Sequence, residues 1–143
     1  MNIQETEQGI VTGYQVLDGN PVDSDLVKET VGKHIRLFDK SPKELATDRG
    51  FSSKENEEYL TNTGVNRVSM PKKGKLNKER KQHQKQYWFK RLQRFRAGSE
   101  AKISLLKRKF GLKRSRLRGT RGTNIHVGWG ILAHNLWQAA RLC

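Results

Sequence analysis

The chain has 143 residues, enough for one domain and too few for two of ordinary size. It contains no run of about 18 apolar residues, which excludes a transmembrane helix. Its only cysteine, Cys143, excludes a disulfide framework and a cysteine-based metal site, and its first residues lack the features of a secretory signal.

The net charge of +15 is concentrated in the second half of the chain. Residues 1–70 carry 8 Lys/Arg and 12 Asp/Glu, a net charge of −4, whereas residues 71–143 carry 21 Lys/Arg and 2 acids, a net charge of +19. Such a density of cations attracts polyanions by neutralising phosphates and releasing counterions. Nucleic acid is the expected partner, and a membrane surface or a ribosomal setting are alternatives that charge alone leaves open.

The beginning of the chain predicts a strand followed by a helix. β-Branched and aromatic residues favour a strand over residues 10–17, and the turn signal Asp18-Gly19-Asn20-Pro21 ends it. A helix capped by Ser24 then follows, and Ser41-Pro42 ends it. Its expected buried stripe has helical spacing and consists of Val27, Val31, Ile35 and Phe38.

Two more strands and a helix are predicted before residue 71. Residues 44–47 favour a short strand that ends at Asp48, and residues 65–70 favour another. Between them, Ser52 and Glu55 form a capping box for a helix through Leu60. The alternation of strands and helices is typical of an α/β fold in which neighbouring strands are parallel.

The basic half predicts two long helices and two connecting segments. Residues 71–86 indicate a basic linker or a frayed helix start, and residues 112–123 a flexible basic segment. Residues 124–142 predict a buried helix. Residues 87–111 predict the longest helix, whose stripe at helical spacing is Phe89, Leu92, Phe95, Ser99, Ile103, Leu106 and Phe110. Tyr87 and Trp88 adjoin basic residues and could stack on unpaired bases, but they are assigned to the core.

Two carboxylates stand out as candidates for chemistry. Glu100 is the only acid in the last 64 residues, and on the predicted helix it shares a face with Arg96 and Lys107. Asp48 follows a strand, at the position where α/β sheets bind ligands. A surface ion pair and a turn aspartate are the plain alternatives. Together, two carboxylates supply the oxygen ligands that Mg²⁺ or Mn²⁺ uses in phosphoryl transfer.

Several segments resemble a known family. GNPVDSD, ATDRGFSS and RFRAGSEAKISLLKRKFGL, followed by an apolar helix containing HNLWQAAR, resemble the second half of the DDE transposase domain of bacterial insertion sequences. Arg96, Glu100 and Lys107 match the helix pattern Y-x2-R-x3-E-x6-K of several of these transposases, and Gln93 replaces the tyrosine. The resemblance implies a partial ribonuclease-H-like sheet with flanking helices and a basic C-terminal helical region over residues 1–143, with 71–86 as an internal linker.

The resemblance also implies site residues, cofactors and partners. Asp48 and Glu100 are expected to be the second and third catalytic acids and to bind Mg²⁺ or Mn²⁺, with carboxylates roughly 4–8 Å apart. Transposon ends and target DNA are the expected partners of a cytoplasmic, DNA-associated protein that can oligomerise on DNA. The expected DNA contacts are Arg96, Lys107, Lys72, Lys73, Lys75, Arg114, Arg116 and Arg118.

The first acid of the family has no counterpart in this sequence. It belongs to a strand upstream of the one predicted at residues 10–17, where only MNIQETEQG stands, and Asp18 is better explained as a turn former. We therefore expect a truncated C-terminal part of the catalytic domain that binds DNA without cleaving it. The alternative is a non-enzymatic basic protein of ribosomal or nucleoid type, in which Glu100 only pairs with a cation. The four histidines are expected to pack or to lie at the surface, without a metal.

Overall fold

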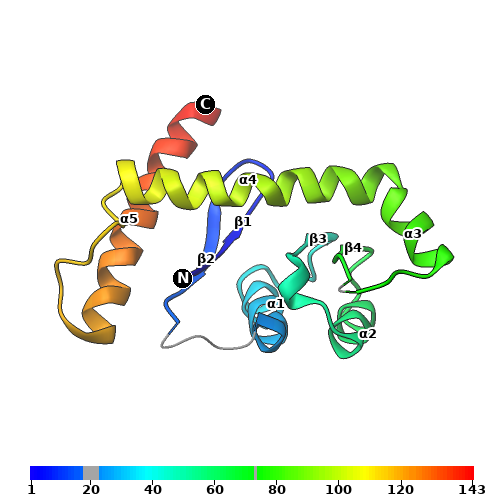
Figure 1. Cartoon of the computed structure of the whole chain (residues 1–143). Coiled ribbons are helices and arrows are strands. Elements are labelled where there is room, and N and C mark those ends of the chain that lie inside the picture. Colours follow the sequence, from blue (N-terminus) through cyan, green and yellow to red (C-terminus); the bar gives the residue numbers. More distant parts are fainter. Residues whose placement is uncertain (18–22, 73) are drawn as a thin grey trace. The chain divides into compact units, whose positions relative to one another are not determined.

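The computed structural model describes residues 1–17, 23–72 and 74–143. These residues form two compact units (Figure 1), and the predicted turn at residues 18–21 lies outside the described residues. Unit 1 comprises Met1–Pro21 and Gly98–Cys143, and unit 2 comprises Val22–Ala97. Each unit has its own core and is described by itself.

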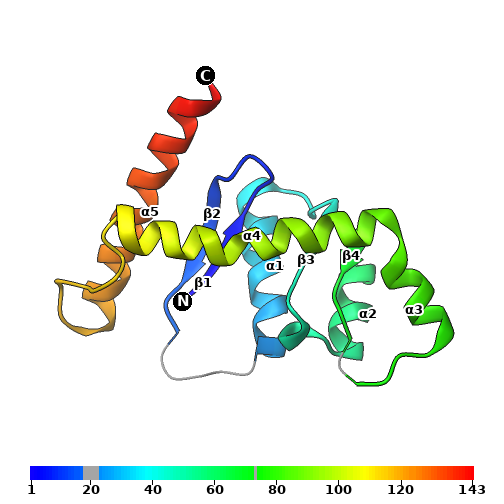
Figure 2. The ribbon, with the colours of Figure 1, turned by 45° about the horizontal axis from the view of Figure 1, so that its top comes forward.

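Unit 1 is built on an antiparallel pair of strands covered by a long helix. Strand β1 (Asn2–Glu5) pairs with β2 (Val11–Gln15), and helix α5 (Gly119–Leu142) packs on β2. The unit also holds the second half of helix α4 (Tyr87–Lys109), seen from two directions in Figures 1 and 2. Its buried apolar cluster consists of Val11, Val127 and Ile131.

Polar side chains attach the helices of unit 1 to its strands. The Asn135 carboxamide on α5 donates to the Val11 carbonyl oxygen at 2.8 Å and accepts from the Val11 N–H at 2.9 Å. On α4, the Lys102 ammonium pairs with the Glu5 carboxylate at 3.2 Å and donates to the Gly9 carbonyl oxygen at 3.3 Å. Both charged side chains are largely buried. The bonds to Val11 and Gly9 satisfy backbone groups of β2 and of the connection between the two strands.

Unit 2 has a parallel pair of strands packed against helices. Strands β3 (Glu44–Ala46) and β4 (Arg67–Ser69) are parallel. The other elements are the 3-10 turns η1 (Asp23–Asp25) and η2 (Arg49–Phe51), helices α1 (Leu26–Phe38), α2 (Lys54–Asn62) and α3 (Lys78–Lys85), and the first half of α4. Apolar side chains of α1, α2 and the two strands form the core, with Val27, Val31, Leu60, Val65 and Met70 buried.

The fold is a mixed α/β fold, in agreement with the expected class, but its strands are grouped differently. Parallel pairing is confirmed for β3 and β4. The strand expected at residues 10–17 pairs instead with β1, so the described residues form two separate two-stranded sheets. Strand β1 was not predicted, because Asn2–Glu5 contains a single apolar side chain, Ile3, and has no alternating pattern.

The helices and their caps differ from the predictions at four places. Residues 71–86, expected to be a basic linker or the frayed start of a helix, hold helix α3, because the Asn77 side chain caps it by accepting from the Arg80 N–H at 2.8 Å, and Lys, Glu and Gln favour helix. The cap of α2 is Ser53, which bonds the Asn56 N–H at 3.0 Å, one residue after the predicted Ser52. Helix α5 begins at Gly119 within the segment expected to be flexible, and Ser24 does not cap α1.

The predicted apolar stripes are buried only in part. On α4, Phe89, Leu92 and Leu106 are buried as expected, whereas Tyr87 and Phe95 are exposed. On α1, Phe38 is exposed as well. Helix α5 buries one face and exposes another, so the prediction of a buried helix is wrong for half of its circumference.

Acidification is expected to destabilise unit 1 through His134. This ring is fully buried, with Nδ1 3.2 Å from the Asn135 Oδ1 and Nε2 3.4 Å from the Lys102 ammonium. Burial, and secondarily the Lys102 charge, lower the pKa of His134 below its ordinary value of 6.5. As the pH falls below 6.5, His134 is therefore protonated more readily in the unfolded chain than in the folded chain. The unfolding free energy that unit 1 has above this pH then decreases.

Urea unfolding at pH 7.5 and pH 5 measures this effect. The loss of unfolding free energy on acidification should be smaller in His134→Gln than in the unchanged chain, because the substituted side chain does not titrate. An equal loss in both proteins would contradict a role for His134.

Candidate functional site

Asp48 lies at the carboxyl end of the parallel strand pair. It directly follows β3 and Thr47, and one carboxylate oxygen accepts from the Arg49 N–H at 2.6 Å, which caps the turn η2. The other oxygen pairs with the Arg96 guanidinium of α4 at 2.9 Å. The Asp48 side chain is half exposed. The structure therefore brings together two of the predicted site residues, Asp48 and Arg96.

Gln93 fixes α4 against the ends of both parallel strands. Its side-chain amide donates to the Ser69 carbonyl oxygen at 2.8 Å, to the Ser69 hydroxyl at 3.0 Å and to the Thr47 carbonyl oxygen at 3.2 Å. The Ser69 hydroxyl in turn donates to the Phe89 carbonyl oxygen at 3.0 Å. In the sequence Gln93 stands out only because it replaces the tyrosine of the family pattern, and this replacement is the one available signal of its role.

A second acid in unit 2 is held by cations in the same way. Glu44, at the start of β3, pairs with Arg67 at 2.9 Å and with Arg91 of α4. The hydrogen bonds from Arg91 and Arg67 lower the pKa of the Glu44 carboxyl group, so it stays ionised in mildly acidic solution. The first half of α4 thus supplies one cation to each end of β3.

Glu100 lies on α4, one helical turn after Arg96, and its side chain is exposed. It belongs to unit 1, whereas Asp48 belongs to unit 2. The expected approach of the two carboxylates therefore stays a prediction.

Neither a cluster of potential metal ligands nor a helix able to span a membrane is found in the described residues. Across residues 1–17, 23–72 and 74–143, no three His, Cys, Asp or Glu side chains gather closely enough to bind a metal ion. Chemically, the Asp48 carboxylate suits Mg²⁺ or Mn²⁺ as one oxygen ligand, and it would have to exchange its contact with Arg96 for the metal. Within the same ranges, no helix has the length and apolar character to cross a membrane.

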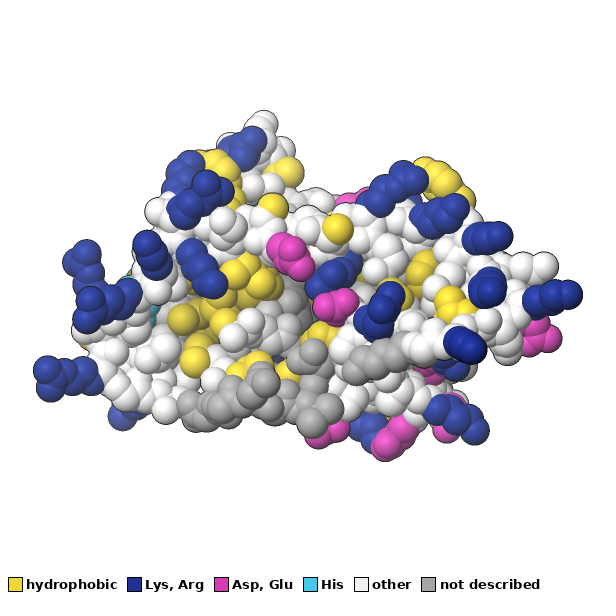
Figure 3. All heavy atoms as spheres, viewed as in Figure 1, with side chains coloured by type: hydrophobic (Ala, Val, Ile, Leu, Met, Phe, Trp, Pro, Cys, Tyr) yellow, Lys and Arg dark blue, Asp and Glu magenta, His cyan; other side chains and the backbone are white. Residues whose placement is uncertain are grey.

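The predicted DNA contacts of unit 1 lie in one basic segment, residues 107–121. Its eight cations are all exposed, and no acid follows Glu100 in the sequence. They include the predicted Lys107, Arg114, Arg116 and Arg118. Figure 3 shows the side chains of Lys and Arg along the end of α4 and the connection to α5. This segment is suited to neutralise several phosphates.

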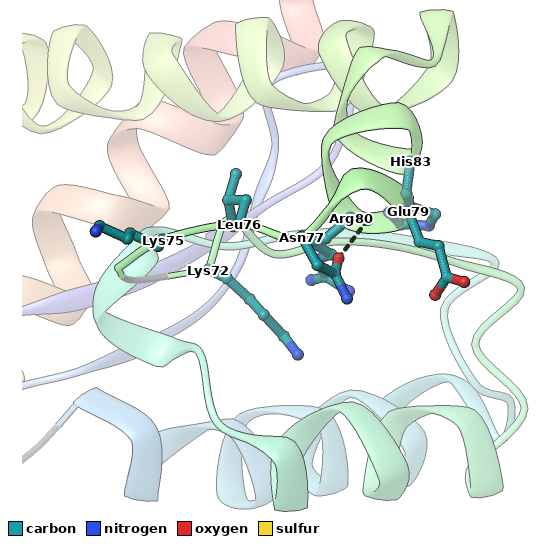
Figure 4. A pocket seen from close by; sticks show the side chains of 7 residues that line it. All are labelled: Lys72, Lys75, Leu76, Asn77, Glu79, Arg80 and His83. Atoms are coloured by element: carbon teal, nitrogen blue, oxygen red, sulfur yellow. Dashed lines mark hydrogen bonds between the residues drawn. The ribbon is translucent and has the colours of Figure 1, made fainter.

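The predicted contacts of unit 2 border an open hollow beside α3. Lys72 and Lys75 line it together with Arg80 and His83, as Figure 4 shows, and its volume is about 570 Å³. Glu57 offsets part of the positive charge by pairing with Lys72 at 3.6 Å and with Arg80. The predicted contact Lys73 lies outside the described residues.

Comparison with known proteins gives one match. The sequence model of a family described as the transposase DDE domain matches residues 3–136. No curated protein and no solved structure gives a significant match to the chain. The family match begins within β1 and extends into helix α5.

Substitution of Gln93 should loosen the carboxyl ends of β3 and β4. In Gln93→Ala the Thr47 carbonyl oxygen loses the Gln93 donor, and the Ser69 carbonyl oxygen keeps only the bond from the Thr47 N–H at 3.0 Å, which is expected to lower the unfolding free energy by about 1–2 kcal/mol. Urea unfolding measures this change, and hydrogen exchange at the Arg49 N–H should accelerate. Gln82→Ala, at an exposed position on α3, should change the free energy by less than about 0.5 kcal/mol. Equal effects of the two substitutions on the unfolding free energy would show that the Gln93 hydrogen bonds do not stabilise the ends of the strands.

Proposed function

The chain belongs to the transposase DDE domain family, and we propose that it supplies Asp48 and Glu100 as two acids of a metal-dependent site for DNA strand cleavage and transfer. The family as a whole implies DNA transposition. The observation that carries the residue assignment is the position of Asp48, which follows β3 inside the matched region and contacts Arg96 of the R-x3-E-x6-K pattern.

We further propose that residues 3–136 form part of a ribonuclease-H-like catalytic domain. A parallel pair and an antiparallel pair of strands, with helices packed on them, are compatible with a part of such a mixed sheet. In this proposal residues 71–86 connect β4 to the helix that carries Glu100, and α3 is a helical section of this connection.

Members of this family generally use divalent metal ions, and Asp48 and Glu100 are proposed to provide carboxylate ligands for Mg²⁺ or Mn²⁺. When bound, the ions would activate the attacking oxygen and stabilise the leaving oxygen of the phosphodiester. Arg96 holds the Asp48 carboxylate in the described structure. Because the Asp48 side chain is half exposed, a cation can replace Arg96 there, and the released guanidinium can then bind a DNA phosphate.

DNA binding is proposed to rest on the exposed cations and to depend little on base sequence. Lys107, Arg114, Arg116 and Arg118 lie in the basic segment of residues 107–121, and Lys72 and Lys75 border the hollow of unit 2. Phosphate contacts position DNA without reading its bases. The alternative of a ribosomal or nucleoid protein is not favoured, because the family match covers residues 3–136.

We expect Mn²⁺ to bind at Asp48 and Glu100 in preference to the other acidic residues. Paramagnetic broadening of amide NMR signals should be strongest around these two residues, because a carboxylate pair holds the ion more tightly than single exposed acids. Asp48→Asn or Glu100→Gln should remove the broadening at both positions, and this measurement does not require turnover. Glu58→Gln, which removes an exposed acid of α2, should leave it unchanged. Broadening that survives either site substitution would contradict a shared site.

DNA binding should weaken steeply with salt, and residues 107–121 should account for much of that dependence. Replacing Arg114, Arg116 and Arg118 together by Gln should reduce the slope of log K against log[salt] by about 2–3, since each phosphate contact contributes about 0.9. Fluorescence anisotropy with a duplex of arbitrary sequence, titrated at several salt concentrations, measures this slope.

The matched control removes three cations that pair with acids in unit 2. Lys28, Lys33 and Lys54 contact Glu55, Glu29 and Glu58, respectively. Their triple replacement by Gln changes the net charge by the same amount and should leave the slope nearly unchanged. A similar loss in both triple variants would show that binding follows total charge and not the basic segment.

A further inference from the structure

The corner between helices α3 and α4 carries an aromatic side chain that the fold of unit 2 does not use. Tyr87, the first residue of α4, is 76% exposed, the highest value among the large apolar side chains of the described residues. The two aromatic residues that follow it serve the fold. Phe89 is buried, and Trp88 donates its indole N–H to the Gln86 side chain and lies against the Arg67 guanidinium, 5.9 Å from the ring centroid. Of the three consecutive rings, only that of Tyr87 is open to solvent.

Two cations share the face of α4 on which Tyr87 lies. Lys90 and Arg94 follow Tyr87 at steps of three and four residues, so at 100° per residue the three side chains lie within about 60° of one another. Both cations are exposed. Arg96, which contacts Asp48, is turned roughly 120–180° away from them around the helix. This face of α4 is therefore distinct from the candidate catalytic site.

Helix α3 adds three more cations beside the corner. Lys78, Lys81 and Lys85 recur at the same steps of three and four residues, and all three are exposed. Glu79 is the one acid in the sequence from residue 71 to residue 99. Figure 3 shows basic side chains over α3 and the adjoining end of α4. None of the five exposed cations at this corner is among the DNA contacts expected from the sequence, so together with the open ring they form a separate surface.

An open aromatic ring among cations fits an unpaired nucleic-acid strand better than a duplex. A base of a single strand has a free face that stacks on an aromatic side chain, and the cations on either side neutralise the phosphates. In a duplex the neighbouring base pairs cover the faces of each base, so a duplex can use the cations but not the ring. The exposure of Tyr87 therefore distinguishes between the two forms of DNA.

We propose that Tyr87 and the cations beside it form a docking surface for a single strand of DNA. The Tyr87 ring stacks on an unpaired base, and the flanking phosphates contact Lys85, Lys90 and Arg94. The surface rests on DNA as the partner in the proposed function, but it requires neither of the two proposed catalytic acids. Because it lies away from the candidate catalytic site, it holds a part of the strand other than the part at that site.

Fluorescence anisotropy with the full chain and three labelled oligonucleotides tests the stacking. They are a single strand of about 12 thymidines, an abasic strand of the same length and a duplex of the same length. Tyr87→Ala should raise the dissociation constant for the thymidine strand about tenfold and change the constants for the other two less than about twofold, because only the thymidine strand offers an unstacked base. Tyr87→Phe keeps the ring and should bind all three like the unchanged chain. Phe38→Ala, which removes a 40% exposed ring of α1, is the matched control and should change none of the constants. Circular dichroism verifies that each variant keeps its helices.

The salt dependence of binding to the thymidine strand tests the cations. Replacing Lys90 and Arg94 together by Gln should reduce the slope of log K against log[salt] by about 1–1.5, since each phosphate contact of a single strand contributes about 0.7. Replacing Lys33 and Lys54 by Gln removes the same charge from two side chains that pair with acids of unit 2. This control should leave the slope nearly unchanged.

Two results would overturn the single-strand surface. Unchanged affinity of Tyr87→Ala for the thymidine strand would show that the ring is not used. An equal loss of affinity for the thymidine strand, the abasic strand and the duplex would show that Tyr87 supports the fold or the phosphate contacts and does not stack on a base. A chain that binds neither single strand nor duplex would contradict the proposed DNA binding as well, so the failures of the two proposals are distinguishable.

Discussion

A side-chain carboxamide that bonds to strand backbone is the interaction on which both units depend. Asn135 forms both hydrogen bonds with the backbone of Val11 in unit 1, and Gln93 donates to Thr47 and Ser69 in unit 2. A carboxamide carries the same donor and acceptor as a peptide group, so it can take the place of a missing neighbouring strand. Two-stranded sheets are only marginally stable alone, and these bonds attach each one to a long helix.

The charged side chains of unit 2 are arranged to compensate one another. Arg91 and Arg96 of α4 neutralise Glu44 and Asp48, which lie at the start and just beyond the end of β3. The cations of residues 107–121 have no acid in their own segment and are exposed to solvent. In the structure the basic side chains therefore form two groups. Some pair with acids and stabilise the fold, and the others are exposed and available to a polyanion.

Helix α5 illustrates how one apolar sequence serves two surfaces. The half of its circumference that contains Val127 and Ile131 forms the core of unit 1, and the half that contains Trp129 and Leu136 faces outward. Because the helix lacks charged residues from 122 to 140, its hydropathy resembles that of a buried helix, which is why the sequence predicted one. The strand residues and Leu112 that pack on α5 cover only the half that contains Val127 and Ile131.

The sequence by itself determined the elements with strong periodicity or a clear terminator. It identified the strand around Val11–Gln15, the parallel pair β3 and β4, the helix from Tyr87 to Lys109 and the segments that resemble the transposase family, because these depend on local spacing and residue type. Only the tertiary structure decided that β1 exists and that Arg96 contacts Asp48. It also decided which face of α5 is covered. These outcomes depend on residues distant in sequence, such as Glu5 with Lys102 or Gln93 with Ser69, whose contacts leave no periodic trace in the chain.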